Sequence, residues 1–176
     1  MNALSEWQNF YVIMGSAAGA LIGLQFVVMA LIADMPFEGE ESHAVTAFST
    51  PSIIHFSAVL LLGAAMVMPW HSLRHLVAVW GIIGLSGIGY TAFTGRRLRT
   101  QSSYAPLAED WIFRVVLPAL TYIVLTAAWP VSHVDVRGAL FQVAAVVLAL
   151  LFTGIHHAWD NATYLVFVKR QEKKQA

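Results

Sequence analysis

The sequence contains no cysteine in its 176 residues. This absence excludes disulfide bonds, thiolate metal sites and a cysteine nucleophile. Charged residues are also scarce, because Asp, Glu, Lys and Arg make up 11% of the chain, against about 25% in an ordinary soluble domain. Positive and negative charges balance to a formal net charge of zero. The chain as a whole therefore has no field that would attract nucleic acid.

Motifs of common enzyme classes are also missing. The sequence has no glycine-rich phosphate loop, no nucleophile elbow and no pair of carboxylates at a catalytic spacing. None of its polar segments is long enough to form a catalytic domain. The sequence therefore favours a non-enzymatic role.

Hydrophobic residues are abundant at 58% of the chain and occur in long runs. A run of about 18 or more residues with few charges predicts a membrane span, and no soluble fold of this size could hide so much apolar surface. Residues 1–10 contain no Lys or Arg, so we expect the first run to be a retained span and not a cleaved signal peptide. The predicted spans are 10–32, 51–70, 75–94, 112–130 and 138–168.

These spans predict an all-α integral membrane bundle of about five transmembrane helices. Residues 1–168 would form one transmembrane domain, and residues 169–176 would form a polar, basic cytoplasmic tail. The connections between successive spans alternate between the two sides of the membrane, and most basic residues fall on one of these sides. Only Arg74 and Arg137 fall in the connections of the other side. The positive-inside rule then places the N-terminus outside and the C-terminus in the cytoplasm. A four-span alternative would break this charge asymmetry.

Small residues at regular spacing mark two of the spans. Gly15, Gly19 and Gly23 are four residues apart, and such residues let helix backbones approach closely in lipid. This glycine-zipper pattern predicts either packing inside the monomer or a self-association face of a homo-oligomer. A second set in the third span could form the other side of that contact; it comprises Gly81, Gly84 and Gly87.

The fifth span carries the most unusual polar residues. Ionisable groups at membrane depth are costly and are functional candidates by default. Several polar residues of other spans fall in the same inner half, so we expect one polar cluster there. Adjacent histidines point about 100° apart on a helix, so only one of the pair should meet the histidine of the second span. The expected cluster comprises Gln25, His55, Arg114, His156, His157, Asp160 and Asn161.

Three interpretations of this cluster remain open. It could join helices by hydrogen bonds, with Asp160 paired to Arg114 or to a histidine. It could form a polar pathway or proton relay. It could instead hold haem or a transition metal through His55 with His156 or His157, since neutral imidazole suits such metals.

A second group of possible metal ligands lies in the two predicted outer turns. These residues could meet and bind a divalent cation, or they could be ordinary side chains of the membrane interface. The group comprises His71, His75, His133 and Asp135.

Two segments have a distinctive order of residues. The first is Trp7-x-x-Phe10-Tyr11 followed by Gly15-Ser16-Ala17-Ala18-Gly19 and continuing to Val27, and the second is Gly154-Ile155-His156-His157-Ala158-Trp159-Asp160. They resemble the opening and closing helices of a loose group of small, uncharacterised bacterial multi-span membrane proteins. The resemblance covers a minority of the chain. It implies a location in the bacterial inner membrane and carries no activity with it.

Three functional hypotheses follow. The first is a non-enzymatic membrane protein that assembles through its glycine face, as a homo-oligomer or as a subunit of a membrane complex. The second is an ion or proton channel, or a transport protein, that uses the inner polar cluster. The third is a haem or metal protein. The expected partners are the lipid bilayer and either a second copy or another membrane subunit, and nucleic acid is not expected.

Overall fold

A computed structural model describes residues 2–33, 40–100 and 108–175, with side chains over 4–31, 50–100 and 108–163. Every element in these residues is helical. Residues 34–39 and the side chains of the predicted tail lie outside the described residues. The elements are α1 (Asn2–Ser5), α2 (Gln8–Ala33), α3 (Glu40–Val67), α4 (Leu73–Thr100), α5 (Ala108–Trp111), the π-helical stretch η1 (Ile112–Val116), α6 (Leu117–Ser132) and α7 (Val136–Gln175).

Five helical segments are long and apolar enough to cross a membrane. They are Gln8–Leu31, Thr50–Val67, Leu73–Thr100, Ala108–Ser132 and Val136–Thr163. Each exposes large apolar side chains on its outer face, as Ile13, Leu61, Ile82, Leu120 and Phe152 do. Water would oppose such exposure, whereas lipid hydrocarbon favours it. The predicted number of helices long and apolar enough to span a membrane is confirmed, and five such helices indicate a multi-pass membrane protein.

The helix boundaries differ from the prediction in three places. The third helix was expected to end at residue 94, but α4 continues through the basic stretch to Thr100. Arg is a good helix former and is favoured near a helix C-terminus, where the helix dipole is negative. Helix α3 begins well before Pro51 and contains it. Helix α7 runs through most of the predicted tail to Gln175.

Two short turns close one end of the bundle, and both follow from local chemistry. Pro69 follows α3 and cannot continue the helical hydrogen bonding. The Trp70 side chain then donates a hydrogen bond from Nε1 to the carbonyl oxygen of Ala65, at 2.6 Å. Asp135 precedes α7, and its carbonyl oxygen accepts the first helical hydrogen bond, from the N–H of Ala139. Asp is among the residues preferred at such an N-terminal cap.

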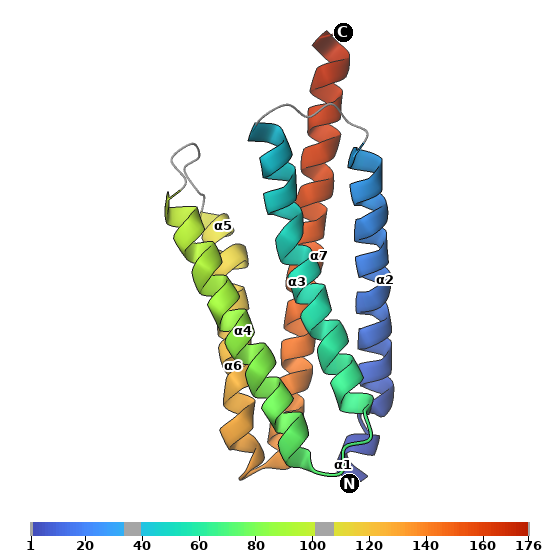
Figure 1. Cartoon of the computed structure of the whole chain (residues 1–176), viewed down its shortest axis with the longest axis vertical. Helices are drawn as coiled ribbons and strands as arrows, with labels where there is room; N and C mark the ends of the chain where they lie inside the picture. Colours follow the sequence, from blue (N-terminus) through green and yellow to red (C-terminus); the bar gives the residue numbers. More distant parts are fainter. Residues whose placement is uncertain (1, 34–39, 101–107, 176) are drawn as a thin grey trace.

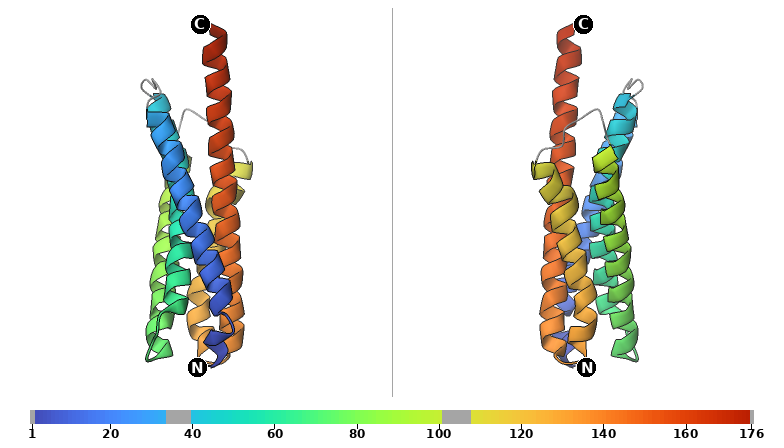
Figure 2. Two further views of the ribbon diagram at one scale, coloured as in Figure 1. Left: turned by 90° about the vertical axis from the view of Figure 1, so that its right-hand side faces the viewer. Right: turned by 90° about the vertical axis from the view of Figure 1, so that its left-hand side faces the viewer.

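The helices are arranged as two pairs joined by a central helix (Figure 1). Helix α2 packs on α3, helix α4 packs on α6, and α7 packs on both α3 and α6. We call the end with residues 68–72 and 133–135 the turn end, and the opposite end, where α4 finishes, the arginine end. Figures 1 and 2 show α7 projecting beyond the other helices at the arginine end.

Glycines set the spacing within each pair, but not as the sequence suggested. Gly15 of α2 is buried against Gly63 of α3, where a β-carbon added to Gly63 would lie 3.1 Å from the Gly15 Cα. Gly84 and Gly87 of α4 instead face Tyr122 and its neighbours on α6. The suggestion that the α4 glycines form the other side of the α2 contact is therefore wrong. The two glycine sets serve two separate helix pairs.

Candidate functional site

A polar cluster lies inside the arginine-end half of the bundle. His55 of α3, Tyr122 of α6 and His157 of α7 are all at least nine-tenths buried. The His55 ring centroid lies 5.6 Å from that of His157, 5.9 Å from that of Tyr122, and 6.2 Å from that of Tyr90 on α4. Four helices therefore each supply one ring to a common centre.

Small residues beside the rings make this convergence possible. Gly154 lies one turn before His157, and a β-carbon there would collide with the ring of Phe56. Its absence lets α3 and α7 approach closely at the level of His55. On the other side of the cluster, a β-carbon at Gly87 would collide with the ring of Tyr122. The missing side chains of the two glycines thus leave the space that the rings of Phe56 and Tyr122 occupy.

The buried rings differ in their hydrogen bonding. His55 Nδ1 lies 3.0 Å from the Tyr122 hydroxyl, in a hydrogen bond that links α3 to α6. Neither ring nitrogen of His157 has a hydrogen-bond partner in the described part of the chain. The backbone of Phe113 lies beside the His157 ring without the geometry of a hydrogen bond. Buried polar groups are nearly always paired, so His157 is placed to bind water, an ion or a ligand.

His156 faces outward from this centre, towards acidic side chains. Its Nε2 lies 3.8 Å from a Glu109 carboxylate oxygen, and its Nδ1 lies 3.1 Å from an Asp160 carboxylate oxygen. The ring also packs on Phe113 with a centroid distance of 3.7 Å. The Glu109 side chain is 71% exposed, so this outer group is in contact with solvent. The two adjacent histidines therefore divide as predicted, and His157 alone meets His55.

Other predicted members of the cluster have different neighbours. Arg114 pairs with Asp110 on its own helical segment, at 3.3 Å. Asp160 pairs with His156, so of the two expected partners the histidine is confirmed, but within one helix. Asn161 is buried one turn beyond His157. Gln25 is buried on α2, and among the described residues no hydrogen bond or ion pair joins it to the histidines.

The segment before α6 departs from regular α-helical geometry. Residues Ile112–Val116 form a π-helix, which carries Arg114 and places Phe113 against both adjacent histidines. Single π-helical turns inside α-helices are rare and occur frequently at functional sites. This irregularity therefore coincides with the outer edge of the cluster.

The structure does not assemble a metal-binding set of the usual size. Within the described residues, no three His, Asp or Glu side chains gather closely enough to hold a metal ion. This finding covers the outer-turn group, so its four members do not form the metal set that was considered as one of two possibilities; His75 instead stacks on Trp70 with a ring centroid distance of 6.3 Å. The inner histidines come together only as the pair His55 and His157.

The cluster ends about halfway through the bundle. One turn closer to the turn end, Val59, Leu125 and Leu150 are completely buried. These apolar residues separate Tyr122 from the turn end. On the side towards the turn end, the cluster is therefore bordered by apolar residues.

Sequence reasoning missed the tyrosines and the acidic partner. Tyr122 lies ten residues inside the predicted span 112–130, too deep for a residue of the aromatic belt at the membrane interface. The depth of Tyr122 in the predicted span was the signal that could have identified it as a member of the cluster. The approach of Glu109 to His156 depends on how α5 is placed against α7, and no pattern in the sequence carries that information.

Comparison of the sequence with models of protein families, with curated proteins and with solved structures finds no match. The functional argument therefore rests on the geometry of the site.

Proposed function

We propose that this polytopic membrane protein takes up protons from one aqueous face through its inner polar cluster, as part of a transport or channel activity. The observation that carries this proposal is the position of His157. It is buried, both of its ring nitrogens are unpartnered, and it lies between a solvent-exposed acidic group and the hydrogen-bonded pair His55–Tyr122.

The groups form a succession from the surface inward. Glu109 and Asp160 flank His156 at the exposed edge. The His156 and His157 ring centroids are 6.2 Å apart, and those of His157 and His55 are 5.6 Å apart. One water molecule can bridge polar groups at such separations. Histidine is the side chain whose ordinary titration range suits proton transfer near neutral pH.

The apolar layer beyond Tyr122 argues against a permanently open pore. A protein that moves a solute or proton with access from one side at a time needs such a closed half. The arrangement therefore supports controlled transfer, with the cluster as the loading site. The location we propose is the bacterial inner membrane, with the arginine end on the cytoplasmic side.

Proton flux in reconstituted liposomes tests this proposal. We expect the wild-type protein to speed the collapse of an imposed pH gradient, measured with an entrapped pH-sensitive dye. His157→Gln should slow this protein-dependent flux by at least about tenfold, since a positioned proton-transfer group contributes a factor of that order or more. Glutamine keeps a polar side chain of similar size but cannot accept and release a proton.

His75→Gln is the matched control, because His75 is exposed at the turn end and should leave the flux unchanged. Protein-dependent flux that is absent in the wild type, or equal in the wild type and His157→Gln, would contradict the proposal.

Assembly remains a second candidate because one small-residue face of α2 is free of intrachain packing. Gly15 is used against Gly63, but Ser16, Ala20 and Gly23 are exposed, and nothing within 4 Å would meet a β-carbon at Gly23. Such residues favour close helix contact in lipid. The candidate interface is therefore the outer face of α2, and not the face that Gly15 occupies.

Gly23→Leu should dissociate a homo-oligomer while the monomer stays folded, as measured by cross-linking in membranes. Gly89→Leu provides the control, since Gly89 is an equally open glycine on α4. Retention of the cross-linked species in Gly23→Leu would remove this candidate.

A further inference from the structure

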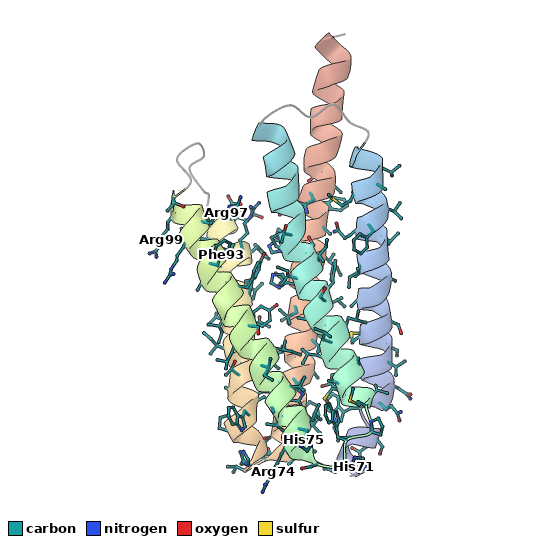
Figure 3. All side chains as sticks on the ribbon, in the orientation of Figure 1. His71, Arg74, His75, Phe93, Arg97 and Arg99 are labelled. Atoms are coloured by element: carbon teal, nitrogen blue, oxygen red, sulfur yellow. The ribbon has the colours of Figure 1, made fainter. Side chains whose placement is uncertain are left out.

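One face of α4 continues the polar cluster to the membrane boundary. Tyr90, Thr94 and Arg97 are spaced by four and three residues and therefore share a face of the helix. Tyr90 contacts His55 at the inner end of this face. The positive charges of Arg97 and Arg114 both act on the Tyr90 side chain. In Figure 3, Arg97 points towards α3, whereas Arg99 points to the opposite side of α4.

The carboxylates of the arginine end that the structure describes have other partners. Asp110 pairs with Arg114, and Glu109 and Asp160 flank His156. Helix α4 itself contains no Asp or Glu. Within the described residues, no ion pair joins Arg97 to a carboxylate. An exposed guanidinium without a carboxylate partner among the described residues is suited to bind an anion from outside the chain.

The depth of Arg97 matches a phospholipid phosphate. Arg74 and Arg97 lie at opposite ends of α4, and 23 residues at 1.5 Å each separate them by roughly 34 Å, slightly more than a hydrocarbon core of about 30 Å. Phe93, one turn closer to the middle of the membrane, is 63% exposed. A lipid whose phosphate met Arg97 would therefore lay its acyl chains along Phe93.

The polar cluster reaches this face of α4 through Tyr90, whose ring lies 6.2 Å from that of His55 on α3, between centroids. Helices α3 and α4 each pack more extensively on other helices than on one another. The Tyr90 hydroxyl, which interacts with the Thr94 side chain, is a neutral hydrogen-bond donor on the Arg97 face. It complements the arginine, as a phosphate with several acceptor oxygens requires.

We propose that the arginine end of α4, on the face that carries Tyr90, binds the phosphate headgroup of an anionic phospholipid through Arg97 and Tyr90. The lipid approaches sideways from the membrane, with its acyl chains against Phe93. This site is distinct from general attraction to a basic surface, because Arg97 is required whereas Arg99, which lies over the Trp111 ring at 5.6 Å, is not.

The test uses the full chain in nanodiscs of phosphatidylcholine, with and without phosphatidylglycerol. Two quantities are measured: the thermal unfolding midpoint and the number of phosphatidylglycerol molecules retained per chain by native mass spectrometry. In the wild type we expect a higher midpoint with phosphatidylglycerol and one strongly retained lipid. Arg97→Gln should lose most of both effects, and Arg99→Gln, which removes the same charge two residues away, should keep them.

Three results would count against the proposal. Equal losses in Arg97→Gln and Arg99→Gln would show attraction to net charge only and would overturn the site. Inorganic phosphate that raises the midpoint equally in pure phosphatidylcholine would identify a soluble anion and overturn the lipid assignment. Tyr90→Phe, which retains the charge and nearly the shape, should weaken lipid retention; unchanged retention would exclude the inward-facing position of the headgroup.

Discussion

The hydrogen bond between His55 and Tyr122 is a contact between side chains from the two different helix pairs. It joins α3 to α6 at 3.0 Å, deep in the bundle, where water cannot replace it. A buried group left without its partner is costly, because it has lost its hydration. The energetic role of this bond can therefore be measured directly.

Tyr122→Phe should lower the free energy of unfolding in detergent by about 0.5–1.5 kcal/mol, the usual range for one intramolecular hydrogen bond. The cause would be the loss of the hydroxyl that satisfies His55. A double-mutant cycle with His55→Phe separates this bond from packing, because the coupling energy isolates the pair. Strictly additive effects of the two substitutions would show that the bond contributes nothing to stability.

At this scale, the sequence predicted the histidines better than their partners. Periodicity and depth correctly predicted that only one of His156 and His157 would meet His55. The pairing of Arg114 with Asp110 was missed, because both residues lie at the edge of a span, where the helix start was placed too late. Contacts between side chains depend on rotamers and on the angles between helices, and neither can be derived from spacing alone.

Among the elements, the contact between α4 and α6 depends most strictly on glycine. A β-carbon at Gly87 would collide with the Tyr122 ring, and one at Gly84 would collide with the Thr126 side chain. Thr126 is itself held by a hydrogen bond from its hydroxyl to the Tyr122 carbonyl oxygen, at 2.9 Å. The α4 glycines therefore fix the position of one member of the polar cluster.

Gly87→Ala should destabilise the protein by about 1–3 kcal/mol, the usual cost of overpacking a well-packed contact. It should also weaken the His55–Tyr122 hydrogen bond, because the ring must move away from α4. Unfolding in detergent and the chemical shifts of labelled histidine measure the two effects.

Gly89→Ala serves as the control for this experiment, since nothing within 4 Å would meet its β-carbon. It should leave both readouts unchanged or slightly raise stability, because Ala favours a helix over Gly. Equal behaviour of the two variants would show that the α4–α6 contact does not need Gly87.

The glycine pattern illustrates what element-level prediction can achieve. Spacing correctly indicated close helix contacts at Gly15, Gly84 and Gly87, because small residues at such intervals favour backbone approach in a membrane. It failed for Gly23, since nothing within 4 Å would meet a β-carbon there. It did not indicate which helix each face contacts. That choice depends on the whole arrangement, in which Gly63 completes the α2 contact and Tyr122 completes the α4 contact.

For the whole molecule, the number of spans followed from the sequence because hydrocarbon thickness sets a minimum length for each apolar run. The orientation in the membrane is a further prediction. His71 and Arg74 lie at the turn end, and Arg97 and Arg99 lie at the other end (Figure 3). The positive-inside rule assigns the arginine end to the cytoplasm.

The absence of native cysteine makes this orientation simple to test. We expect His71→Cys to react with a membrane-impermeant maleimide in intact cells, because the turn end should face outward. Arg99→Cys should react only in inverted vesicles. The opposite labelling pattern would reverse the orientation, and labelling of both variants from one side would contradict five spans.

Helix α7 is the only described span that packs closely on a member of both pairs. A movement of one pair relative to the other would therefore be a rotation about α7. His55 belongs to one helix pair, Tyr122 belongs to the other, and His157 lies on α7 between them. A small rotation of one helix pair about α7 would stretch the hydrogen bond between His55 and Tyr122 before it disturbed the packing within either pair. The proton uptake proposed for this cluster would therefore be coupled, through one hydrogen bond, to the relative position of the two helix pairs.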